Sequence, residues 1–177
     1  MDNNMDNNMN NIIDNYIFFW KHTEIPYGCF SNWSNHSITE NSITFKTVEH
    51  YIMYHKALLM SDTKIANEIL NVSGPLSAKH LGRKVTNYDE KVWSNKRKDI
   101  IYNALTLKVL QHKDVFDLLI STGDKIIAEA SPYDKIWGIG YNANNALQNN
   151  NNWGLNILGT SWMKVRYTIK QEVINKI

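Results

Sequence analysis

Glu49 places a carboxylate inside the segment FKTVEHYIMYHKAL, residues 45–58, where most neighbouring side chains are aromatic or apolar. The same segment contains two histidines, so a metal site is the first chemistry to consider. His50 and His55 are five residues apart, which turns their side chains roughly 140° away from each other on an α-helix. A helical zinc motif needs histidines four residues apart with the glutamate between them, so we expect no metal site here. Glu49 is then either an ordinary carboxylate at a helix start or a working group of an active site.

Two further segments combine polar or charged side chains with large aromatic ones in glycine-containing loops. They are GCFSNWS, residues 28–34, and ASPYDKIWGIG, residues 130–140. Loops of this kind carry function more often than regular helices and strands do. Asp134 and Trp137 lie in the second loop, and Glu129 directly precedes it. These loops join the Glu49 segment as candidate parts of one site.

No cofactor motif accompanies these segments. Gly138 and Gly140 lack the third glycine of a dinucleotide-binding fingerprint, and an asparagine-rich stretch follows where a helix would have to begin. The single cysteine, Cys29, allows neither an intrachain disulfide nor a metal cage of cysteines. We therefore expect no cofactor and no bound metal.

Length and composition predict one globular domain, residues 15–177, preceded by a disordered asparagine-rich tract, residues 1–14. Of the 177 residues, 43% are hydrophobic, which suffices for a core. The net charge of +2 gives no bulk attraction to nucleic acid or to a membrane surface. The first residues lack the basic and apolar regions of a secretory signal, and no apolar run approaches the ~20 residues that span a bilayer. We expect a cytoplasmic protein that does not associate with membranes.

Hydrophobic periodicity and turn residues predict an α+β fold, a predominantly helical single domain with a few short strands. Strands are expected at residues 16–20, 42–45 and 125–130. Helices are expected at residues 48–60, 61–70, 75–84, 86–111, 114–122 and 155–174. Thr47 is expected to cap the first helix and Gly123 to end the fifth. The asparagine-rich stretch, residues 142–153, is expected to be an enlarged surface loop.

The first expected helix has a clear apolar stripe. Val48, Ile52 and Leu59 belong to it and should face the core. Glu49 and Lys56 are seven residues apart, so they share another face and lie about 10 Å apart along the axis. That face looks exposed from the sequence.

Several motifs occur together in the order found in one protein family. PYGCFSNWS, TVEHYIMYHKAL, TGD, SPYDKIWGIG and LGTSWMKVR resemble the YbiA-like, or NADAR, proteins over residues 16–166. The resemblance implies an N-glycosidase. Some members hydrolyse phosphorylated intermediates of the riboflavin pathway, and others remove ADP-ribose from modified guanine in nucleic acid. By motif match, the resemblance also gives functional roles to Glu49, Asp134 and Trp93.

This chemistry suits the residues present. Cleavage of a ribosyl C–N bond builds positive charge on the sugar, and carboxylates stabilise such charge and activate water. Lys56 is either a phosphate-binding residue or an amine nucleophile at the anomeric carbon. The catalytic residues predicted in this way are Glu49, Asp134, Trp93 and Lys56. The predicted substrate-binding residues are Phe30, Asn32, Trp33, Tyr51, Arg83, Glu129, Trp137 and Gly138.

A non-catalytic module that binds ADP-ribose or a related nucleotide is the main alternative. Two carboxylates beside an anionic ligand disfavour it, because a reader of such a ligand has little need for them. The expected partner is a nucleotide-like small molecule or ADP-ribosylated guanine in nucleic acid, with no obligate protein partner. The sequence does not choose between these substrates.

Overall fold

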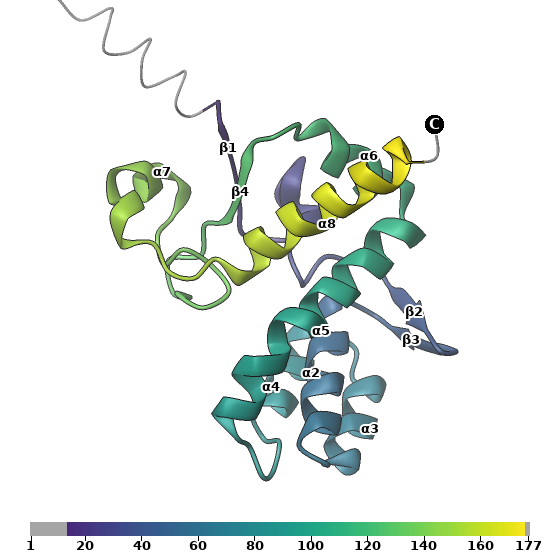
Figure 1. Cartoon of the computed structure of the whole chain (residues 1–177). Coiled ribbons are helices and arrows are strands. Elements are labelled where there is room, and N and C mark those ends of the chain that lie inside the picture. Colours follow the sequence, from purple (N-terminus) through teal and green to yellow (C-terminus); the bar gives the residue numbers. More distant parts are fainter. Residues whose placement is uncertain (1–13, 176–177) are drawn as a thin grey trace, which may run out of the picture.

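The computed structural model describes residues 14–175, so the predicted disordered tract lies outside the described residues apart from Asp14. Helices dominate the molecule and its strands are few and short, which confirms the predicted fold class (Figure 1). The elements are β1 (Tyr16–Phe19), η1 (Tyr27–Phe30), β2 (Ile38–Glu40), β3 (Ile43–Phe45), α2 (Val48–Leu59), α3 (Thr63–Asn71), α4 (Pro75–Gly82), α5 (Glu90–Gln111), α6 (Lys113–Ser121), β4 (Ile126–Glu129), α7 (Ala143–Ala146), η2 (Leu147–Asn152) and α8 (Ile157–Ile174).

The long helix α5 connects two groups of elements. On one side, α2 packs against α3, α4 and α5. On the other, α5 packs against α8, and α8 packs against β4. Figure 1 shows α5 running between the group formed by α2, α3 and α4 and the group that contains α8 and the strands β1 and β4. Side chains that are distant in the sequence can therefore meet where the two groups face each other.

The strands form two separate pairs. β1 and β4 are parallel, and Phe19 is the register partner of Glu129. Because the strands are parallel, their carboxyl ends lie at the same edge, and the segments that follow them start side by side. β2 and β3 form an antiparallel hairpin whose two turn residues, Asn41 and Ser42, have positive φ values of 47° and 66°. β3 was expected from the sequence and β2 was not.

Local capping signals fix most helix ends. The Thr47 side chain accepts a hydrogen bond from the His50 N–H and begins α2, as predicted. Gly123 follows α6 with a φ of 62°, which is the left-handed conformation expected at a helix end. α5 begins at Glu90 and not at residue 86, because Asp89 is its N-cap and accepts from Val92 N. Asn87 has a φ of 54° and interrupts any earlier helical turn.

The asparagine-rich stretch is more ordered than a simple surface loop. It contains α7 and η2, and the Asn142 side chain accepts hydrogen bonds from two backbone N–H groups at the start of α7. Trp153 closes it by donating its indole N–H to Ala146 O at 2.8 Å. The short asparagine side chains favour such local turns and caps, which is why this polar composition folds into helical turns.

No helix among residues 14–175 is long and apolar enough to cross a membrane.

Candidate active site

A cavity of about 680 Å³ lies where the segments after β1 and β4 meet α2, α4 and α5. It brings together all four residues predicted to be catalytic and five of the eight predicted to bind substrate. These are Glu49, Lys56, Trp93 and Asp134 in the first set, and Asn32, Trp33, Arg83, Glu129 and Trp137 in the second. Four of these nine side chains come from α2, α5 and the end of α4, and the other five come from the segment after η1, from β4 and from the loop after β4.

Three residues predicted to bind substrate are not among the described residues that line the cavity. Phe30 is fully buried in the core, where its ring packs 4.8 Å from that of Trp162. Tyr51 points away from the cavity and donates its hydroxyl to Glu40 at 3.0 Å. Gly138 has a packing role, because a Cβ there would lie 2.6 Å from Glu129 O and 3.1 Å from Asp134 O. Each lies next to a cavity residue in the sequence but faces another direction.

The cavity also contains residues that sequence reasoning missed. Trp20 and Lys21 follow β1 and meet Ser131 at the shared edge of the parallel strands. Recognising that β1 and β4 pair in parallel would have placed them there. Lys79 lies on α4, with its amine 5.8 Å from the ring centroid of Trp33. The remaining unpredicted lining residues are His22, Thr23, Ser31, Ile52, Met53, Tyr133 and Ile136.

Glu49 is buried, contrary to the exposed face expected from the sequence. Its side chain is 6% exposed, because α3, α4 and α5 surround α2 on sides that the apolar stripe alone does not reveal. One carboxylate oxygen of Glu49 accepts the indole N–H of Trp33 at 3.2 Å. The backbone N–H of Glu49 donates to Asn32 O at 3.0 Å. Burial raises the pKa of Glu49 to about 7, although Lys79 and the Trp33 hydrogen bond favour the ionised form. Glu49 therefore exchanges a proton near neutral pH.

Glu129 is a second carboxyl group whose ionisation is disfavoured. Its Oε2 atom is buried and has no hydrogen-bond partner among residues 14–175. Burial, together with the charges of Asp134 and Glu49, raises the pKa of Glu129 to about 8. This carboxyl group is mostly protonated at neutral pH, and its proton is available in a cavity that also holds ionisable Glu49.

Asp134 holds its loop in shape. Its Oδ1 atom accepts the backbone N–H groups of Ile136 and Trp137, each at 2.8 Å. These bonds fix a tight turn and leave the half-buried carboxylate at the cavity wall. Asp134 thus forms the turn and also lines the cavity.

Lys56 is held firmly on the opposite wall. Its amine donates to Gly82 O at 2.7 Å and lies 4.4 Å from the ring centroid of Tyr88 and 5.9 Å from that of Trp93. Burial lowers the pKa of Lys56, and the charge of Glu90 partly opposes this effect. Together with Lys79 and the exposed Arg83, Lys56 adds positive charge to the cavity, and Lys79 and Arg83 both act on the carboxyl group of Glu49.

The geometry can be compared with known proteins at this point. The family model for the NADAR domain matches residues 18–170. The chain belongs to the NADAR family. The family resemblance predicted from the motifs is thereby confirmed, over nearly all of the residues on which it rested.

Relatives with this domain include N-glycosidases. N-glycosidase R617 of Acanthamoeba polyphaga mimivirus is 40% identical over 129 residues, which cover 72% of this chain and 76% of the viral protein. N-glycosidase Npun_R5314 of Nostoc punctiforme is 38% identical over 154 residues, 87% of this chain and 92% of that protein. The NMR structure of YbiA from E. coli superposes with a TM-score of 0.76 at 29% identity, covering 91% of this chain and 88% of YbiA. These relatives confirm the expected class of enzyme, a hydrolase acting on N-glycosyl bonds.

Substitution of Gly138 tests its packing role in this NADAR domain. We expect Gly138→Ala to lower the free energy of unfolding by about 1–3 kcal/mol, because the added methyl group has to displace Glu129 O or the Asp134 turn. Chemical denaturation measures this loss. Gly74→Ala is the matched control, since a Cβ at Gly74 meets no atom within 4 Å. Equal effects of the two substitutions would contradict the packing role.

The raised pKa of Glu129 predicts a pH-dependent stability. The carboxyl group ionises near its ordinary pKa of 4.5 in the unfolded chain and near 8 in the folded protein. Between these two pKa values the folded protein keeps the Glu129 proton and the unfolded chain has lost it. The free energy of unfolding therefore falls as the pH rises through this range. We expect Glu129→Gln to raise the melting temperature at about pH 8 and to leave it nearly unchanged at about pH 4. Thermal unfolding at both pH values checks this, and a gain that does not depend on pH would show that titration of Glu129 is not its cause.

Proposed function

We propose that the protein hydrolyses the N-glycosidic bond between a nitrogenous base and the ribose of a phosphate-bearing substrate. The observation that carries this proposal is a pair of carboxyl groups in one cavity, the buried Glu49 and the partly buried Glu129, whose pKa values are raised to about 7 and about 8. Perturbed carboxyl groups that meet in a cleft are typical of acid–base sites. Membership of a family that contains N-glycosidases supports the same chemistry.

The proposed reaction divides the proton transfers between the two glutamates. As the C–N bond breaks, its electron pair goes to the base nitrogen, which takes a proton from Glu129. Positive charge develops on the ribose, and the carboxylate of Asp134 at the cavity wall stabilises it. Glu49, in its ionised form, accepts a proton from the water that attacks the anomeric carbon. The products are the free base and a ribose phosphate with a hydroxyl group at that carbon.

The aromatic and basic side chains suit the other parts of such a substrate. Trp33 and Trp93 offer flat surfaces on which a base can stack. Lys79 and Arg83 line the same cavity and provide positive charge that would attract a phosphate. Lys56 already donates to Gly82 O, a contact that stabilises its charged form, so we assign it to phosphate binding and not to nucleophilic attack.

The cavity volume of about 680 Å³ is in the usual range for sites that bind one small molecule. The substrates that we propose for it are a ribosylamino-pyrimidine phosphate of the riboflavin pathway and the ADP-ribosylated guanine of a nucleic acid. A panel of these substrates, with ADP-ribose and NAD added, tests the proposal by mass spectrometry. We expect release of a free base from at least one member of the panel. Binding to panel members without cleavage of any would overturn the proposal and favour a binding module.

Glu49→Gln tests the assigned base. Gln keeps the size of the side chain and an oxygen that accepts the Trp33 N–H, but it cannot take up the proton. We expect kcat to fall on the order of 10²–10⁴-fold while the dissociation constant of the substrate changes little. Glu172→Gln, at an exposed position of α8, is the matched control and should retain full turnover. Turnover of Glu49→Gln equal to that of the parent would remove Glu49 from the mechanism.

A further inference from the structure

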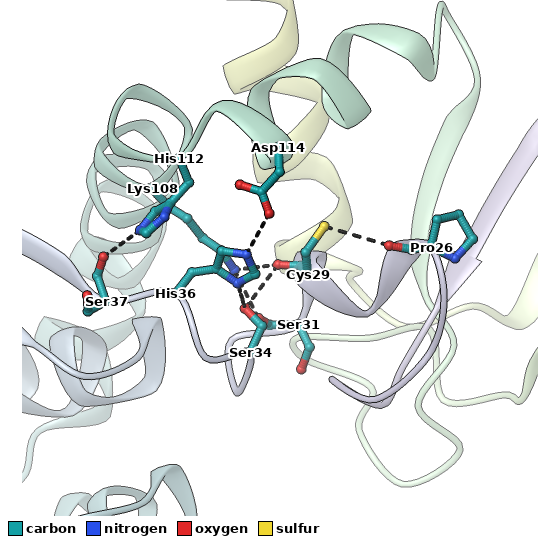
Figure 2. Close-up of polar contacts among 9 residues, drawn as sticks. All are labelled: Pro26, Cys29, Ser31, Ser34, His36, Ser37, Lys108, His112 and Asp114. Atoms are coloured by element: carbon teal, nitrogen blue, oxygen red, sulfur yellow. Dashed lines mark hydrogen bonds and ion pairs between the residues drawn. The ribbon is translucent and has the colours of Figure 1, made fainter.

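A fully buried amine lies behind the loop that presents Trp33 to the cavity. Lys108, on α5, has no exposed surface and donates hydrogen bonds to Cys29 O, to Ser31 O at 3.3 Å and to Ser34 Oγ at 2.5 Å (Figure 2). Among the described residues the amine forms no ion pair. An amine buried against neutral acceptors loses its hydration without the full compensation of a counter-ion. A side chain that served only to fill the core would not need this group.

The three acceptors belong to one short stretch, residues 29–34, which we call the Cys29–Ser34 segment. The segment curls around the amine, since Ser34 Oγ also donates to Cys29 O at 3.1 Å and Ser34 N donates to Ser31 O at 3.2 Å. The Ser34 hydroxyl lies 3.2 Å from Nδ1 of His36. Lys108 thus sits at the centre of the segment and determines its curvature.

The outer layer of this network comes from α6 and the end of α5. His36 Nε2 lies 3.1 Å from a carboxylate oxygen of Asp114, and His112 Nε2 lies 2.6 Å from Ser37 O (Figure 2). The rings of His36 and His112 meet edge to face at 5.0 Å. The charged and titratable groups around Lys108 are therefore Cys29, His36, His112 and Asp114, and none of these four is among the residues that line the cavity.

The other side of the same segment forms part of the active site. Ser31, Asn32 and Trp33 line the cavity. Trp33 donates its indole N–H to Glu49 at 3.2 Å, and Asn32 O accepts the Glu49 backbone N–H at 3.0 Å. The Cys29–Ser34 segment therefore contacts both the buried amine of Lys108 and the side chain and backbone of Glu49.

We propose that Lys108 is a positioning residue of the active site, whose amine fixes the Cys29–Ser34 segment so that Trp33 donates its hydrogen bond to Glu49. This assignment rests on the proposed role of Glu49 as the base. The effect of Lys108 on the pKa of Glu49 can nevertheless be measured without any catalysis. The Trp33 N–H stabilises the ionised form of Glu49, so a segment that loses its anchor also loses part of that stabilisation. Lys108 then influences a proton-transfer group that it does not touch.

Lys108→Met tests this coupling, because Met fills most of the same volume without a donor. We expect the pKa of Glu49 to rise by about one unit, as follows from losing one hydrogen bond to a charged group. The acid limb of the pH profile of kcat/KM should move to higher pH by about the same amount. At pH values below this limb, kcat/KM should therefore be roughly tenfold lower than in the parent protein. Trp33→Phe should produce the same shift. The double variant, Lys108→Met with Trp33→Phe, should show no additional shift, because each substitution removes the same hydrogen bond from Trp33 to Glu49.

Two controls separate positioning from simple loss of stability. Arg166 is also a buried cation, and it donates to Thr122 Oγ1 at 2.7 Å. It belongs to α8, whose described residues do not line the cavity. Arg166→Met should destabilise the protein and leave the acid limb in place. If Lys108→Met does not fold, Ser34→Ala removes one acceptor from the network and should shift the limb in the same direction by a smaller amount.

A carbon-13 NMR titration of the Glu49 carboxyl group gives the decisive readout without any substrate. A raised Glu49 pKa in Lys108→Met or Ser34→Ala, but not in Arg166→Met, supports the proposal even if the parent protein cleaves nothing in the substrate panel. An unchanged Glu49 pKa in the Lys108 and Ser34 variants overturns it, whatever the activity of the parent protein. Additive shifts in the double variant would equally show that Lys108 does not act through Trp33.

Discussion

Keeping several carboxyl groups inside one cavity is the constraint on which the rest of this structure depends. Glu49 and Glu129 resist ionisation because they are buried and because Asp134 adds its negative charge to both. The start of helix α2 favours a negative charge at Glu49 through its dipole. Burial nevertheless raises the pKa of Glu49, against the opposing effects of Lys79, the Trp33 hydrogen bond and Arg83. Such an arrangement lowers the stability of the fold at neutral pH, because burial opposes the charged forms of both groups.

The architecture follows from the need to bring these groups together. Glu49 comes from α2, Glu129 from β4, and Asp134 from the loop after β4. α5 packs against both α2 and α8, and α8 packs against β4, so one helix sets the distance between the two groups of elements. Lys108 lies on the same helix and holds the Cys29–Ser34 segment. A single rigid element therefore determines the width of the cavity and also the placement of the loop that completes it.

The parts of this design that are local could be predicted from the sequence, and the parts that are tertiary could not. Thr47 and Gly123 act through their own backbone neighbourhood, so capping rules located them. The burial of Glu49 depends on three helices packed around α2, which periodicity along one helix cannot show. Tyr51 illustrates the same limit. It lies two residues from Glu49 in the sequence, but residues two apart on a helix point in widely different directions. Tyr51 is therefore not among the residues that line the cavity. Lys79 had no local signal at all and became part of the site only through the packing of α4.

The asparagine-rich stretch shows how an enlarged segment can be added beside a site without disturbing it. Directly after this stretch, Leu155 N donates to Lys135 O at 2.7 Å and Leu158 N donates to Trp137 O at 3.0 Å. These two hydrogen bonds tie the Asp134 loop to the backbone at the start of α8. Gly154 lies so close to Lys135 that a Cβ there would come within 2.3 Å of its carbonyl oxygen. Trp153 packs edge-on against Tyr16 and Phe18 of β1 and closes the stretch before this contact begins. The helical turns of residues 142–152 are therefore closed off by Trp153, and the Asp134 turn is supported by the residues that follow Trp153 and not by the asparagine-rich stretch itself.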